Sequence, residues 1–116
     1  MSTTYESKTG TLSNSTILSS TYSFTYYKIG RIAFVYTGTS FNTVKNKPVG
    51  STDYVLASGL YPSKVEIPYE ILPDTQGSIP ASLVVNASGQ LIFRTYNAVG
   101  SSTTYRRLTF PYITAS

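Results

Sequence analysis

Carboxylates are the groups in this sequence best suited to acid–base or metal chemistry. The chain of 116 residues has no histidine and no cysteine. That absence removes Ser-His-Asp and Cys-His nucleophilic sites and leaves no ligand set for a structural zinc ion. The acids that remain are Glu6, Asp53, Glu66, Glu70 and Asp74. Any general acid–base pair would have to be drawn from these five residues.

The spacing of the acids argues against catalysis. Glu66 and Glu70 share one face of an expected strand, and at ~3.3 Å per residue their Cα atoms lie about 13 Å apart. Glycoside hydrolysis needs two carboxyl groups about 5 to 9.5 Å apart. Asp53 and Asp74 resemble turn residues, and no Asp-x-Asp-x-Asp-Gly calcium loop surrounds them. We therefore expect neither an enzyme nor a metal or cofactor site.

Tyrosine and polar loops favour binding instead. Eleven tyrosines occur in 116 residues, and a tyrosine ring can stack on the C–H face of a sugar while polar side chains bind its hydroxyls. We expect most of the tyrosines to be core or subunit-contact residues. The candidate binding residues lie in or beside polar loops, where binding sites usually occur, and the alternative is that these loops are merely solvated. The candidates are Asn42, Lys45, Asn46 and Lys47 in one group and Arg94, Tyr96 and Asn97 in the other.

Charge and hydropathy exclude other partners. The net charge of +4 is scattered along the chain, and only Lys45-Asn46-Lys47 and Arg106-Arg107 cluster. Nucleic-acid binders concentrate such charge, so we expect no nucleic-acid partner. No apolar run approaches the ~18 residues of a membrane span. The first residues lack a signal-peptide core, which predicts synthesis in the cytoplasm.

Strands must position these residues. Large apolar residues recur with period 2 over residues 22–26, 32–36 and 65–71, with hairpin turns at Lys28-Ile29-Gly30 and Asn86-Ala87-Ser88-Gly89. Pro68 places the strand over residues 64–71 at a sheet edge or a bulge. About seven to eight short strands and no helical period predict an all-β fold, an antiparallel, jelly-roll-like β-sandwich.

The domain organisation follows from composition. Residues 1–20 are rich in serine and threonine and are expected to be a polar lead-in or connector, followed by one sandwich domain over residues 21–116. A small domain with few charges and no disulfide often gains stability by oligomerisation. Arg106 and Arg107 fall in the expected last strand, residues 105–113, so their side chains should point to opposite faces. An inward arginine would need a partner, either an acid such as Glu66 or a neighbouring subunit.

The order of motifs resembles the C-terminal head domains of phage tail-fibre and receptor-binding proteins. The matching segments span roughly residues 22 to 114. They are Tyr27-Lys28-Ile29-Gly30-Arg31 leading into an apolar strand, Leu56-Ala57-Ser58-Gly59-Leu60-Tyr61-Pro62, the hairpin around Asn86-Ala87-Ser88-Gly89, and Tyr112-Ile113-Thr114. The resemblance implies a β-sandwich head, a homotrimer at a fibre tip in the virion, and a bacterial cell-surface glycan as ligand. It carries over no ligand residue.

Three functions remain open. The first is a trimeric head that binds a host receptor for adsorption, the second a structural module of a tail fibre or baseplate, and the third a carbohydrate-binding module of a larger secreted protein. The third predicts a monomer, whereas the first two predict a trimer. Glycan binding separates the first from the second.

Overall fold

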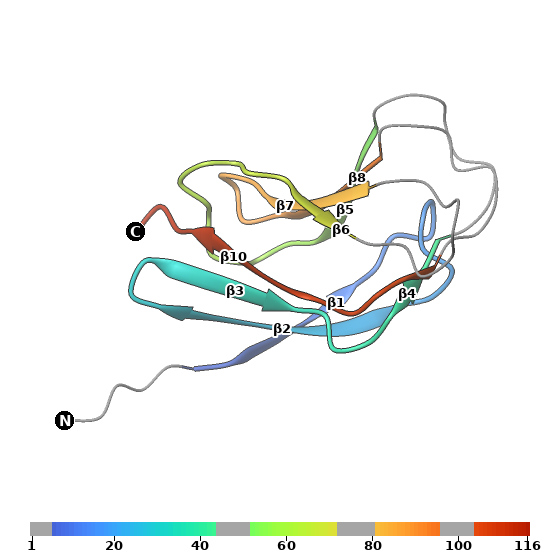
Figure 1. Ribbon diagram of the computed structural model, residues 1–116, viewed down its shortest axis with the longest axis horizontal. Coiled ribbons are helices and arrows are strands. Elements are labelled where there is room, and N and C mark those ends of the chain that lie inside the picture. Colours follow the sequence, from blue (N-terminus) through green and yellow to red (C-terminus); the bar gives the residue numbers. More distant parts are fainter. Residues whose placement is uncertain (1–5, 44–51, 72–80, 96–103) are drawn as a thin grey trace.

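The computed structural model describes residues 6–43, 52–71, 81–95 and 104–116. These residues form antiparallel strands and no helix. Two four-stranded sheets lie one over the other, with the core between them (Figure 1). The structure thus confirms the predicted all-β antiparallel sandwich. The described residues form ten strands because two strands of two residues each join the eight strands of the main sheets.

The first sheet has the order β1-β2-β3-β10, formed by β1 (Lys8–Leu12), β2 (Tyr22–Ile29), β3 (Ile32–Tyr36) and β10 (Thr109–Ile113). The β2–β3 hairpin closes with Ile29 opposite Ile32, and Gly30 has a φ of 62°. Glycine takes this left-handed conformation at no steric cost, which is why the predicted turn forms here. Pro111 lies in β10, an edge strand, where its missing N–H need not break the ladder to β3.

The second sheet has the order β5-β8-β7-β6, formed by β5 (Thr52–Ala57), β6 (Tyr69–Ile71), β7 (Ala81–Val85) and β8 (Leu91–Thr95). Its strands form a Greek key, because β6, β7 and β8 are consecutive neighbours while β5 lies beside β8. The predicted β7–β8 hairpin is confirmed. Its turn is held by Asn86, whose side-chain oxygen accepts hydrogen bonds from the backbone of Ser88 and Gln90 at 3.0 and 2.9 Å.

A small third sheet pairs β4 (Phe41–Asn42) with β9 (Thr104–Tyr105) and closes one end of the core. Three fully buried rings pack there: Phe93 meets Phe41 and Tyr105 edge to face at 6.2 and 5.4 Å, and Phe41 stacks on Tyr105 at 5.6 Å. Burial of such rings is the main source of stability in a domain of this size.

Two predicted strands were wrong in extent. Of the strand expected over residues 64–71, only β6 pairs in the sheet, because Pro68 cannot donate to a ladder; Val65 and Ile67 are exposed. The strand expected over residues 105–113 is interrupted at residues 106–108, between β9 and β10. Arg106 and Arg107 lie in this irregular segment and both are exposed, so neither is the inward arginine that strand alternation suggested.

The segment expected to be a lead-in contributes to the fold. Its residues 8–12 form β1, which pairs with β2 from Lys8 opposite Tyr26 to Leu12 opposite Tyr22. Leu12, Ile17 and Leu18 are buried in the core. Serine and threonine dominate the segment, but three well-placed apolar side chains are enough to fix it against the sandwich.

Buried tyrosines predict a loss of stability at alkaline pH. Burial raises the pKa of Tyr105 from 10.0 to about 12, and burial beside Tyr26 and Tyr61 also raises the pKa of Tyr112. An unfolded tyrosine ionises first, so the free energy of unfolding should be constant below pH 10 and fall as the pH rises towards 12. For Tyr105 the full loss is about 3 kcal/mol. Urea unfolding from pH 8 to pH 11.5 measures it, and Tyr105→Phe should flatten the decline; an equally steep decline in that variant would contradict the assignment.

Candidate functional site

The structure places two of the seven predicted binding residues. Asn42 lies on β4 and is exposed, and Arg94 lies on β8 and is partly buried. Their preceding neighbours Phe41 and Phe93 meet in the core, so the two strands share one end of the sandwich. Lys45, Asn46, Lys47, Tyr96 and Asn97 lie outside the described residues.

Arg94 is engaged by a cross-strand acid. Its Nε donates to Asp53 Oδ1 at 2.8 Å and its terminal nitrogen to Asp53 Oδ2 at 3.1 Å, a bidentate pair across β8 and β5. The side chains are 25 and 49 % exposed, so solvent screens the pair and its contribution to stability is small. A guanidinium already matched to a carboxylate is a poorer ligand-binding group than the sequence suggested.

Asn42 belongs to a network of neutral hydroxyl and amide groups. Its side-chain oxygen accepts a hydrogen bond from the Thr104 hydroxyl at 2.5 Å, and its backbone N–H donates to the Tyr22 hydroxyl at 3.0 Å. Its carbonyl accepts the backbone N–H and the hydroxyl of Ser19 at 3.0 and 3.3 Å. The Ser19 and Tyr22 hydroxyls are 3.3 Å apart. This network joins β2, β4 and β9 at the surface.

A hollow of about 330 Å³ opens beside this network. We call it the hydroxyl hollow. Six of its seven lining residues are serine, threonine or asparagine, and none is charged. The lining residues are Ser13, Asn14, Ser15, Leu18, Ser19, Ser20 and Thr21.

A single turn shapes the hydroxyl hollow. The Asn14 carbonyl accepts the N–H groups of Ile17 and Leu18, and the Asn14 side-chain oxygen accepts the N–H of Thr16 at 3.0 Å. The Asn14 amide in turn donates to the Val55 carbonyl at 3.0 Å, which ties the turn to β5. Ile17 and Leu18 are buried beneath the turn, so the core anchors it on one side and β5 on the other.

The hydroxyl hollow suits a neutral, polyhydroxylated ligand. Ser15, Ser20 and Thr21 are exposed and can each donate and accept a hydrogen bond. The half-buried ring of Tyr22, which packs on Phe41 at 6.3 Å, follows directly after the lining segment. The serine- and threonine-rich composition of residues 1–20 predicts a connector and therefore gives no indication of this site. The available signal was the apolar pair Ile17 and Leu18 within a serine- and threonine-rich run.

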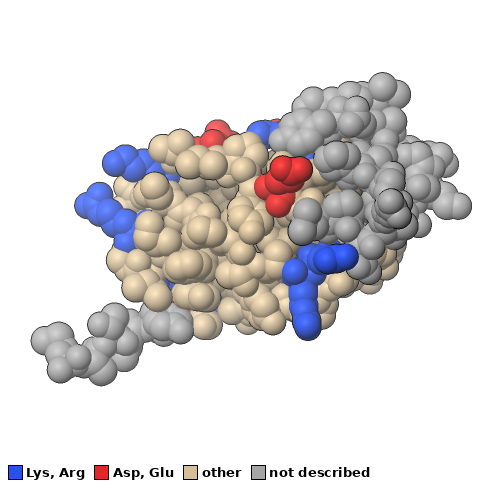
Figure 2. Space-filling view, viewed as in Figure 1, with Lys and Arg blue, Asp and Glu red and all other residues tan. Residues whose placement is uncertain are grey.

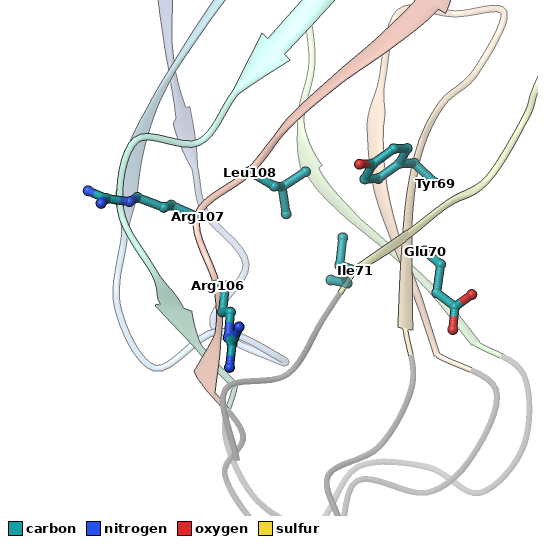
Figure 3. Close-up of a pocket in the computed structure, with 6 residues that line it drawn as sticks. All are labelled: Tyr69, Glu70, Ile71, Arg106, Arg107 and Leu108. Carbon is teal, nitrogen blue, oxygen red and sulfur yellow. The ribbon is translucent and has the colours of Figure 1, made fainter. Parts of the chain in front are cut away.

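A second groove lies along an edge of the sandwich, between β6 and the irregular segment before β10. It is lined by Tyr69, Glu70, Ile71, Arg106, Arg107 and Leu108. Figure 3 shows that Tyr69, Ile71 and Leu108 point into the gap, while Glu70 and Arg107 point away from each other. Tyr69 stacks on Phe110 at 5.4 Å. The charged groups do not converge, so this groove provides no acid–base pair.

Two lysines flank one tyrosine ring elsewhere on the surface. The ammonium groups of Lys8 and Lys28 lie 5.2 and 5.0 Å from the centre of the Tyr61 ring. Lys28 also donates to the Ser116 carbonyl at 3.1 Å. These cation–π contacts connect β1 and β2 to the segment after β5. Because both lysines already lie close to the Tyr61 ring, this ring is a poor candidate for stacking on a ligand.

The described part of the face drawn in Figure 2 is sparsely charged. Figure 2 shows separate groups of charged side chains with a broad uncharged area between them. Within the described residues, no three His, Cys, Asp or Glu side chains gather where they could hold a metal ion. No helix in the described part of the chain has the length and apolar character needed to cross a membrane.

Comparisons with known proteins give no relative for this chain. No protein-family model, no curated protein and no solved structure matches it.

Proposed function

We propose that this chain is the head domain of a phage tail fibre and that it binds a saccharide of the host cell surface during adsorption. The proposal rests on the order of motifs over residues 22–114 together with the antiparallel sandwich in which those motifs lie. Such a head acts at the tip of the virion after synthesis in the host cytoplasm. It works by binding rather than by catalysis.

The hydroxyl hollow is the observation that carries the saccharide assignment. A sugar offers hydroxyl groups that both donate and accept, and the hollow offers the same two functions on serine and threonine side chains. The turn at Asn14 preorganises these groups, which lowers the entropic cost of binding. Small-molecule sites combine a shaped concavity with a few placed polar groups, and the hollow has both features.

The test is a variant that fills the hollow. Ser20 is exposed and lines the hollow, so Ser20→Leu should block ligand entry without disturbing the core. We expect the affinity for purified cell-wall polysaccharide of the host, measured by isothermal titration calorimetry, to fall at least about tenfold, the loss of about 1.4 kcal/mol. Ser7→Leu, a matched change at an exposed serine outside the hollow, should leave the affinity unchanged.

Three results would count against the proposal in different ways. Equal affinity of wild type and Ser20→Leu would remove the hydroxyl hollow as the site. Absence of binding to polysaccharide from a panel of hosts would favour the structural module of a fibre or baseplate. A monomeric wild-type chain that binds polysaccharide would favour the carbohydrate-binding module.

A further inference from the structure

Exposed apolar side chains gather at the end of the sandwich that carries the β2–β3 turn. Ile29, Ile32 and Ile113 form one row across β2, β3 and β10, and the row points away from the second sheet. A groove of about 360 Å³ joins Ile32 and Ile113 to the segment before β6, which contributes Val65 and Ile67. These five side chains have exposed fractions of 38 to 61 %. We call them the apolar end.

The composition of the apolar end departs from that of an ordinary solvated surface. Outward residues of a sheet with one face in water are normally polar. Thr9, Thr11 and Ser23 at the β1 edge of the same sheet follow that rule. Contiguous exposed apolar surface marks an interaction site. Five large aliphatic side chains at one end of the sandwich therefore indicate a surface that a partner covers.

Three cations lie beside the apolar end. Lys28, Arg31 and Lys64 each directly precede one of its residues in the sequence. The Arg31 carbonyl accepts the N–H of Thr114 at 2.9 Å. The Lys64 N–H donates to the Ile113 carbonyl at 2.8 Å, so both cationic residues are fixed beside the end of β10. Figure 2 shows Lys and Arg side chains at the end of the molecule where the β2–β3 turn and the C-terminus lie in Figure 1.

The described acids do not neutralise these cations. Arg31 and Lys64 form no ion pair with another described residue. Lys28 donates a hydrogen bond to the Ser116 carbonyl at 3.1 Å. Glu66 is exposed in the segment before β6 and offsets part of the charge, but three cations against one carboxylate leave this end positive. The partner should therefore be anionic as well as apolar.

We propose that the apolar end binds the surface of a membrane whose lipids carry anionic headgroups. In such a surface the phosphate groups lie directly above the acyl chains, so a single partner meets both the aliphatic side chains and the cations. Lysine and arginine side chains are long enough to keep their charged heads among the phosphates while the neighbouring isoleucines enter the apolar layer. The contact needs no segment that spans the membrane, because the five side chains enter only its outer layer.

Other partners would use only half of this surface. A soluble polyanion pairs with the cations and leaves the apolar side chains in water. An uncharged apolar partner covers the aliphatic side chains and supplies no counter-charge for Arg31 or Lys64. The rigid turn adds to the lipid contact, because Gly30 fixes Ile29 opposite Ile32 and no loop has to become ordered on binding.

The apolar end and the hydroxyl hollow are separate sites. The lining of the hollow ends at Thr21, directly before β2, whereas Ile29 is the last residue of β2. At ~3.3 Å per residue these two positions lie about 26 Å apart. Ser20→Leu should therefore bind lipid as wild type does, and a failure of the lipid contact would leave the saccharide proposal as it stands.

Cosedimentation of the full chain with lipid vesicles measures the contact. We expect vesicles of phosphatidylglycerol and phosphatidylcholine in equal parts to bind the protein at least about tenfold more strongly than vesicles of phosphatidylcholine alone, since each cation near an anionic surface strengthens binding about fivefold. Salt at about 0.5 M should remove most of this difference, because it screens the charges. Absence of binding to the anionic vesicles, or equal binding to both kinds, overturns the inference.

Ile32→Asn tests the apolar part of the contact. Ile32 lies in the middle of the isoleucine row and points away from the core, so the change removes an aliphatic side chain from the surface alone. We expect binding to the anionic vesicles to fall at least about tenfold. Val55→Asn is the matched control, because Val55 is 39 % exposed on the other sheet against 38 % for Ile32, and it should bind as wild type does. Equal binding of the two variants overturns the inference.

Tryptophan fluorescence keeps the test decisive if Ile32→Asn does not fold. The chain has no tryptophan, so Ile32→Trp and Val55→Trp each introduce a single reporter. We expect anionic vesicles to shift the emission at position 32 to shorter wavelength, because the ring enters the headgroup layer, and to leave the emission at position 55 unchanged. Emission unchanged at both positions overturns the inference. A shift at position 32 that appears without vesicles as the protein is concentrated would assign the apolar end to a copy of the chain, and would overturn the inference as well.

Discussion

Gly89→Ala is expected to destabilise the fold by about 3 kcal/mol, the sum of left-handed backbone strain and a displaced hydrogen bond. Gly89 has a φ of 76°, and a Cβ added there would collide with the backbone carbonyl oxygen of Leu60. The carbonyl of Gly89 accepts the N–H of Leu60 at 3.0 Å, so the two backbones cannot separate without losing this bond. Urea unfolding at a fixed protein concentration measures the loss.

Gly30→Ala provides the matched control for Gly89→Ala. Gly30 also has a left-handed backbone, with a φ of 62°, but nothing lies within 4 Å of a Cβ built there. Only the strain term applies, and we expect a loss of about 1 kcal/mol. Equal losses in the two variants would show that the close approach to Leu60 has no energetic weight, contrary to the prediction.

Phe93→Ala is expected to cost about 3 to 5 kcal/mol, the range for deleting a fully buried phenylalanine. Phe93 is 0 % exposed and contacts three other rings, Phe41 at 6.2 Å, Tyr105 at 5.4 Å and Tyr54 at 6.5 Å. Removing it leaves a cavity at the end of the core that is closed by β4 and β9. A domain of this size has about 5 to 15 kcal/mol of stability in total, so the variant should unfold at a much lower urea concentration.

Phe93→Leu separates cavity formation from loss of the aromatic contacts. Leucine fills most of the space, so the loss should be much smaller than for alanine. Wild type, Phe93→Ala and Phe93→Leu should be compared at one protein concentration, because association would make the unfolding midpoint depend on concentration. A Phe93→Ala variant with wild-type stability would contradict the aromatic cluster as the centre of the core.

Short-range chemistry explains which elements could be predicted. The turns at Gly30 and at Asn86 to Gly89 form because glycine accepts a positive φ and asparagine binds its own following backbone, and neither effect needs a distant residue. The strands beside them follow from alternation. The strand over residues 64–71 was predicted too long because alternation continues through Pro68 while ladder pairing does not.

The candidate site depended on contacts far apart in the chain. Arg94 looked available for a ligand until the register placed Asp53 opposite it, 41 residues away. The hydroxyl hollow exists because the Asn14 amide reaches the Val55 carbonyl and Ser19 binds the Asn42 carbonyl. No local pattern encodes such pairings, since they arise when separate strands pack.

The sequence by itself determined the fold class, the two hairpins and the absence of histidine and cysteine chemistry, because each depends on residue type or on neighbours in the chain. It also showed that both faces of residues 32–36 are apolar. Alternation assigns residues to two opposite faces but cannot say which face meets the core. Only the tertiary structure decided that Ala33 and Val35 face the second sheet while Ile32, Phe34 and Tyr36 face outward. Because the second sheet packs against only one side, Ile32 and Tyr36 remain exposed on the other side.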